Sequence, residues 1–107
     1  MIKVYQIQLT DAEIAAVNNG ETSDRIKAYF DRSFERTFKA ENFQYYTHVA
    51  NVDTNDMEEA FALMNLWEDE SKVEKLGPCS SMSVGDILDV DGKLFRCASV
   101  GFDEIKA

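Results

Sequence analysis

Residues 87–100 read ILDVDGKLFRCASV, and this stretch decides the fold class. Ile87 to Val90 form a short apolar and β-branched run, and Leu94 to Val100 form a second one. Between the two runs, Asp91-Gly92 is a strong two-residue turn signal, because both residues tolerate the positive φ angles that join antiparallel strands tightly. The stretch therefore predicts a β-hairpin near the C-terminus.

Two segments upstream of this hairpin have helical periodicity. A helix is predicted over about residues 23–38, where apolar and small side chains share one broad arc and arginines lie on the other side. A second helix is predicted over about residues 56–67, opened by Asn55-x-x-Glu58. Its expected buried stripe has helical spacing and consists of Met57, Ala60, Phe61, Met64 and Trp67.

A short helix and two further strands complete the predicted elements. Thr10 with Glu13 forms a capping box that opens the short helix, whose inner stripe we expect to be Ile14 and Val17. Residues 2–9 and 43–52 are rich in β-branched and aromatic side chains, which predicts strands. Residues 1–107 are thus expected to form a single α+β domain. It should have a mainly antiparallel sheet of about four strands, three helices packed on one face, and the C-terminal β-hairpin.

Composition restricts the class of partner. The 107 residues carry 11 Lys and Arg against 20 Asp and Glu, a formal net charge of −9. This balance argues against direct binding to nucleic acid or to an anionic membrane, both of which attract positive faces. No apolar stretch is long enough for a signal peptide or a membrane span, so we expect a cytoplasmic protein. Oligomeric state is left open between monomer and homodimer.

Residues with catalytic or ligand-binding chemistry do not fall into a known pattern. The five glycines match no nucleotide fingerprint, and we predict no catalytic residues, no cofactor and no metal. Cys79 and Cys97 are expected to be free thiols, since no CxxC spacing links them. The alternative from another class is a small hydrolase or transferase that uses Ser81, Ser83 or His48. It requires a concave pocket at the turn before the hairpin.

Charged residues are distributed unevenly along the chain. Between Glu41 and Glu70 there are eight acids and no Lys or Arg, whereas residues 25–39 contain five Lys or Arg and only two acids. Solvated helix faces explain such a pattern, but it also suggests two binding surfaces. The candidate partner-binding acidic surface consists of Glu58, Glu59, Glu68, Asp69 and Glu70, and the candidate basic stripe consists of Arg25, Arg32 and Arg36. A finer alternative is that the acidic surface imitates a phosphate backbone and inhibits a host DNA- or RNA-binding protein.

Residues 80–102 contain a motif with a family resemblance. The run Ser80-Ser-Met-Ser-Val-Gly-Asp-Ile-Leu-Asp-Val90, the Asp91-Gly92 turn, Phe95-Arg96-Cys97 and the Gly101-Phe102 pair together resemble the C-terminal signature of YodL-like domains. The resemblance implies a small bacteriophage or mobile-element protein, and it carries over no catalytic residues. Each position also has a structural explanation: Ser83 caps a turn, Val84 fills the core, and Gly85-Asp86 gives a tight turn into the strand at Ile87.

The resulting expectation is a non-enzymatic accessory protein of phage type. It would act in the host cytoplasm by binding a host or phage protein. A glycine–aspartate turn before a hairpin also occurs in small RNA-binding β-barrels, but the net charge and the predicted helices argue against that class.

Overall fold

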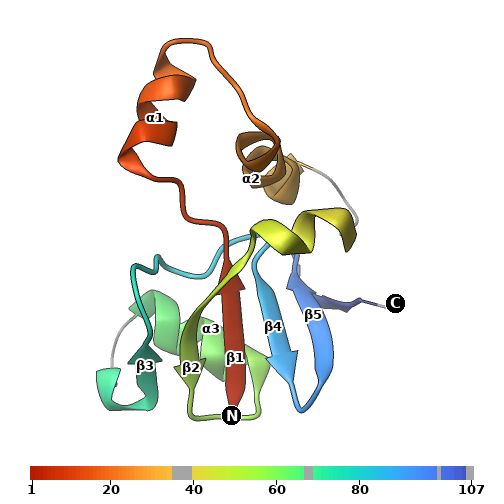
Figure 1. Cartoon of the computed structure of the whole chain (residues 1–107). Coiled ribbons are helices and arrows are strands. Elements are labelled where there is room, and N and C mark those ends of the chain that lie inside the picture. Colours follow the sequence, from red (N-terminus) through yellow and green to blue (C-terminus); the bar gives the residue numbers. More distant parts are fainter. Residues whose placement is uncertain (35–39, 67–68, 99, 106–107) are drawn as a thin grey trace.

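A computed structural model of the chain describes residues 1–34, 40–66, 69–98 and 100–105. It is an α+β fold in which six strands form one antiparallel sheet, in the order β3-β2-β1-β4-β5-β6 (Figure 1). The strands are β1 (Ile2–Gln6), β2 (Thr47–Val52), β3 (Val73–Lys75), β4 (Ile87–Val90), β5 (Lys93–Cys97) and β6 (Phe102–Glu104). The helices are α1 (Asp11–Asn18), α2 (Asp24–Phe34) and α3 (Met57–Leu66), with short 3-10 segments η1 (Ala40–Tyr45) and η2 (Glu70–Lys72).

The apolar core lies between one face of this sheet and α3. Directly paired residues of antiparallel strands share a face, so Ile2 and Val4 of β1 lie beside Val52, Ala50 and Leu88 of the neighbouring strands. Helix α3 lies behind the sheet in Figure 1 and adds three buried side chains to the same cluster. These three are Ala60, Leu63 and Met64.

The other two helices do not share that face, which corrects the expected layering. Helix α2 and segment η1 lie beyond the end of the sheet where β1 finishes, and α1 projects further away (Figure 1). No residue of α1 is buried, and Ile14, expected on its inner stripe, is 48% exposed. Helical periodicity identifies the apolar side of a helix but does not supply a surface for it to pack on.

The predicted hairpin is present as β4 and β5. Val90 pairs with Lys93, and the two residues between them have positive φ angles, 52° for Asp91 and 89° for Gly92. The returning strand ends at Cys97, and β6 then pairs with it as an outer strand. Together with β3 at the opposite edge, β6 brings the sheet to six strands where about four were expected.

Two local predictions are wrong. Residues 40–45 form η1 and not the start of a strand, so β2 begins at Thr47. The ring of Phe43 contacts those of Tyr5 and Tyr46, with centroids 5.4 and 5.8 Å apart, and aromatic enrichment here reflects ring packing and not strand pairing. In α3, Phe61 is 37% exposed while Leu63 is buried.

Candidate functional site

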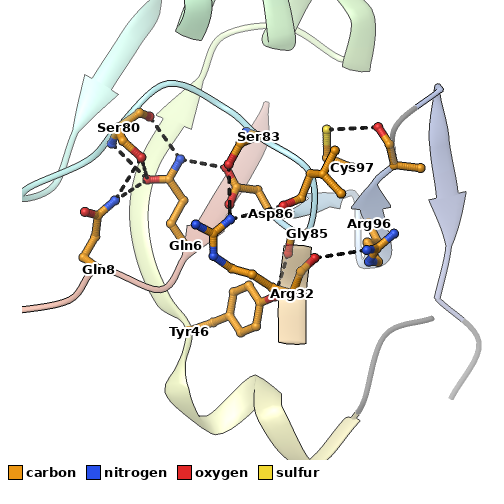
Figure 2. Close-up of polar contacts among 12 residues, drawn as sticks. Gln6, Gln8, Arg32, Tyr46, Ser80, Ser83, Gly85, Asp86, Arg96 and Cys97 are labelled. Carbon is orange, nitrogen blue, oxygen red and sulfur yellow. Dashed lines mark hydrogen bonds and ion pairs between the residues drawn. The ribbon is translucent and has the colours of Figure 1, made fainter. Parts of the chain in front are cut away.

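A buried polar cluster lies where α2 meets the turn before β4. Its centre is the carboxylate of Asp86, which is only 2% exposed (Figure 2). Oxygen Oδ2 accepts two hydrogen bonds, from the backbone N–H of Ser83 and from Nε2 of Gln6, each at 2.9 Å. The backbone N–H of Asp86 donates to the carbonyl of Ser83 at 3.0 Å, so side chain and main chain together close the turn.

Arg32 brings the opposite charge to Asp86 from α2. Its Nη1 lies 3.7 Å from Oδ1 of Asp86 and donates to Oγ of Ser83 at 3.2 Å and to the carbonyl of Val84 at 3.1 Å. The guanidinium also lies over the ring of Tyr29, 4.3 Å from its centroid. Only 11% of the Arg32 side chain is exposed, so solvent screens this ion pair much less than it would a surface pair.

Gly85 allows the backbone of α2 to approach this turn. Its φ angle is 93°, and a Cβ atom at this position would lie 2.1 Å from the carbonyl oxygen of Arg32. The carbonyl of Gly85 accepts a hydrogen bond from the hydroxyl of Tyr46 at 2.6 Å, and the carbonyl of Arg32 accepts one from Nη2 of Arg96 at 3.0 Å. Only glycine meets both the conformational and the steric requirement here.

Burial sets the protonation behaviour of the cluster. It raises the pKa of Asp86 to about 6, opposed by the Ser83 N–H, the charge of Arg32 and the Gln6 amide. Burial also raises the pKa of Tyr46 to about 12 and that of the Cys97 thiol to about 11. At neutral pH, Tyr46 and Cys97 are therefore uncharged, and Asp86 is the group of these three that titrates near physiological pH.

The residues of the hydrolase alternative have separate surroundings. Ser83 contacts Arg32 and Asp86, whereas Nε2 of His48 lies 2.7 Å from Oδ1 of Asn51 and its ring stacks near Tyr5. Ser81 is exposed. Among the hydrogen bonds of the described residues, none joins Ser81 or Ser83 to His48 as nucleophile and base.

The resembling motif mostly builds the turn. Ser83, Gly85 and Asp86 hold it closed and let α2 approach, as described above, and the strand begins directly afterwards at Ile87. One expected role differs: Val84 is only half-buried, and the residue of this segment that enters the apolar core is Met82, which is 3% exposed.

The predicted acidic surface lies at the two ends of α3. Glu58 and Glu59 are exposed in its first turn, and Asp69 and Glu70 are exposed where η2 begins. Asp69 also caps η2, accepting hydrogen bonds from the backbone N–H and the hydroxyl of Ser71. Glu68 lies outside the described residues.

The arginines of the predicted basic stripe face the protein. Arg25 pairs with Glu13, Nε to Oε2, at 3.1 Å and donates to the carbonyls of Tyr45 and Gln8. Arg32 enters the Asp86 cluster, and Arg36 lies outside the described residues. Both described arginines thus hold α2 in place and do not form a solvated stripe.

Sequence reasoning missed the central pair of this cluster and its partner Gln6. Arg32 and Asp86 are 54 positions apart, so no local pattern links them. A buried role for Gln6 could have been predicted, because Gln6 follows Ile2 and Val4 at alternate positions of β1. All three side chains are buried. A polar residue at a core position indicates a buried hydrogen-bonding partner.

In the described part of the chain, no group of three or more His, Cys, Asp or Glu side chains is arranged to hold a metal ion. The helices described there are too short or too polar to cross a bilayer. No protein-family model matches the chain, and no curated protein or solved structure matches it either.

Proposed function

We propose that this protein is a non-catalytic binding protein whose partner is a protein with a basic surface. The observation that carries the proposal is the exposure of four carboxylates at the ends of α3, those of Glu58, Glu59, Asp69 and Glu70. Arg25 and Arg32 do not neutralise them, because these two cations pair with Glu13 and Asp86.

Electrostatics favours a basic partner over other classes. A net charge of −9 repels nucleic acid and anionic membranes and attracts positively charged protein surfaces. Complementary charge raises the rate of association and makes it sensitive to salt. A partner that itself binds DNA or RNA would fit this surface, since its basic face is built to contact phosphates.

The likeness of residues 80–102 to YodL-like domains adds a proposed origin. It supports a phage or mobile-element protein that binds a host or phage protein in the host cytoplasm. Most of the motif residues described above build the turn before β4, so we assign the binding role to the acidic surface and not to this motif.

Affinity capture with two charge-matched variants tests the proposal. The test variant is E58Q/E59Q/D69N/E70Q, in which the amide oxygen introduced by D69N can still cap η2. The control is E21Q/D91N/D103N/E104Q, which removes four exposed acids from other elements. Both variants have the same net charge, so only the position of the lost carboxylates differs between them.

We expect the wild type and the control to retain one stoichiometric basic protein from host lysate at low salt, and the test variant to lose it. Binding should weaken steeply as salt is raised from about 50 to 300 mM, because the Debye length shortens over this range. Equal retention by the test variant, or recovery of no stoichiometric partner by the wild type, would contradict the proposal.

A further inference from the structure

Two large apolar side chains of α3 are exposed, although this helix packs on the sheet (Figure 1). Phe61 is 37% exposed and Leu66 is 64% exposed. Among the side chains that the structure describes, α1 and α2 expose one such residue each, Ile14 and Phe30. Single exposed apolar residues are normal on soluble proteins, whereas a group of them on one surface marks an interaction site. The exposed side of α3 therefore needs an explanation of its own.

Helix geometry joins Phe61 and Leu66 into one patch. At 3.6 residues per turn, Ala62 and Asn65 lie between them around the helix, and residues three or four positions apart are neighbours. Ala62 and Asn65 are half-buried and uncharged. The buried side chains of α3 lie on the opposite side, against the sheet. We call the four residues Phe61, Ala62, Asn65 and Leu66 the α3 patch.

Exposed carboxylates flank the α3 patch at both ends of the helix. Glu58 and Glu59 lie in the first turn of α3, and Asp69 and Glu70 lie where η2 begins. Residues 40–71 contain no Lys or Arg, so no cation of this part of the sequence offsets the four acids. An uncharged, mostly apolar surface thus lies between two acidic pairs.

We propose that the α3 patch docks onto a protein that presents an apolar pocket flanked by Lys or Arg side chains. Phe61 and Leu66 enter the pocket, and the two acidic pairs meet the cations on either side of it. This inference rests on the proposed function, which assigns binding to the same acidic surface. It adds the apolar contact that determines affinity.

Apolar and charged residues contribute differently to such a complex. Protein interfaces have an apolar, fully desolvated centre and a polar rim, and a few side chains at the centre hold most of the binding free energy. Charges at the rim mainly raise the rate of association and orient the partner. The order of acidic, apolar and acidic residues along α3 has this arrangement.

Charge favours a basic protein over other occupants of the α3 patch. A second copy of this chain that docks through the same face would bring the acids of one α3 against those of the other, and like charges across an interface are unfavourable. Nucleic acid and anionic membranes are repelled by the net charge of −9. A basic protein complements both ends of the patch.

Calorimetric titration with the basic protein retained in affinity capture, once identified and purified, tests the docking. The test variants are Phe61→Ala and Leu66→Ala, and the matched control is Phe30→Ala, whose side chain is 40% exposed on α2. We expect each test variant to bind about tenfold more weakly than the wild type, the scale of one lost apolar anchor, and the control to bind like the wild type. The loss should be the same at about 50 and 150 mM salt, because screening acts on charges.

The heat capacity of binding gives a second measurement. Burial of apolar surface makes this heat-capacity change negative, so it should be smaller in magnitude for Leu66→Ala than for the wild type and unchanged for Phe30→Ala. If Phe61→Ala does not fold, Leu66→Ala decides the question, because its side chain is mostly exposed.

The outcomes separate this inference from the proposed function. If the variant lacking the four acids loses the partner while Phe61→Ala and Leu66→Ala bind like the wild type, docking through the α3 patch is wrong and the proposed function stands. If the wild type retains no partner, or the variant lacking the four acids binds as tightly as the wild type, both are wrong. A wild type that sediments as a dimer, and as a monomer after Leu66→Ala, would assign the patch to a second copy and overturn the inference alone.

Discussion

Helix α3 and helix α2 are held to the same sheet in opposite ways. Helix α3 places Ala60, Leu63 and Met64 in an apolar cluster with the strands. Helix α2 buries Ile26 and Ala28 and is also held by polar contacts, among them those of two arginines that reach carbonyl groups and carboxylates. The two helices are similar in length, with 11 residues in α2 and 10 in α3.

The comparison shows how the means of attachment determines what a helix responds to. Burial of apolar surface is non-directional and does not depend on proton concentration. An ion pair in a buried site is directional, and it changes when one partner titrates. We therefore expect α3 to unfold only with the whole domain, and α2 to respond locally to single polar substitutions.

Removing an apolar anchor of α3 should have the largest effect. Met64 is fully buried, so Met64→Ala should lower the free energy of unfolding by about 4 kcal/mol through lost burial and a residual cavity. The matched control is Leu66→Ala in the same helix, where the side chain is 64% exposed and the cost should be below about 1 kcal/mol. Urea denaturation measures both, and a similar loss for the two variants would place the core elsewhere.

Gly85→Ala should have the next largest effect, on the α2 side of the molecule. The added Cβ would meet the carbonyl oxygen of Arg32 at 2.1 Å, and a positive φ angle adds strain, together about 3 kcal/mol. Gly92→Ala is the control, because its φ angle of 89° is similar but no atom lies within 4 Å of the added Cβ. Hydrogen exchange should show loss of protection in α2 for Gly85→Ala alone. An equal cost for both alanines would mean that φ strain, and not contact with α2, constrains Gly85.

The same contrast separates what sequence predicts from what it misses. The Asp91-Gly92 turn and the apolar stripe of α3 are local patterns, and both elements form within a few residues of the expected bounds. A helical pattern also predicts an inner stripe on α1, yet no residue of α1 is fully buried, because no pattern within a helix reveals whether another element covers it.

Sequence reasoning failed for the arginines of α2 for a related reason. The spacing of Arg25 and Arg32 on the polar side of a helix predicts a solvated stripe, which holds only when nothing polar faces that side. In this protein, Asp86 and several main-chain carbonyls face the polar side of α2 and bind these arginines. These groups come close to α2 because Gly85 has no Cβ atom and leaves room for the helix backbone. The sequence shows Gly85 only as one residue of a turn.

Global stability should change with pH because Asp86 is buried in the folded protein. The pKa of Asp86 is about 6 in the folded protein, above the ordinary value of 3.8, so this group contributes stability that is fully present below about pH 4 and is lost as pH rises through 6. The loss is about 2 to 3 kcal/mol for a shift of this size. Denaturation of the wild type minus Asp86→Asn, at pH 4 and 7, isolates this contribution. A difference that does not change with pH would show that Asp86 titrates normally.

The smallest effect concerns the second ion pair of α2, between Arg25 and Glu13. The capping hydrogen bond from the backbone of Thr10 is the main reason that the pKa of Glu13 is lowered, with the Arg25 hydrogen bond and charge also contributing. A lowered pKa contributes stability above the ordinary value of 4.5 that is lost as pH falls through the folded value. Glu13→Gln can keep the capping box but not the charge, so it should cost about 0.5 kcal/mol at pH 7, as for most accessible ion pairs. The cost should shrink in acid and in high salt, as measured by thermal denaturation. A cost that stays the same in acid and in high salt would show that the charge of Glu13 does not contribute this stability.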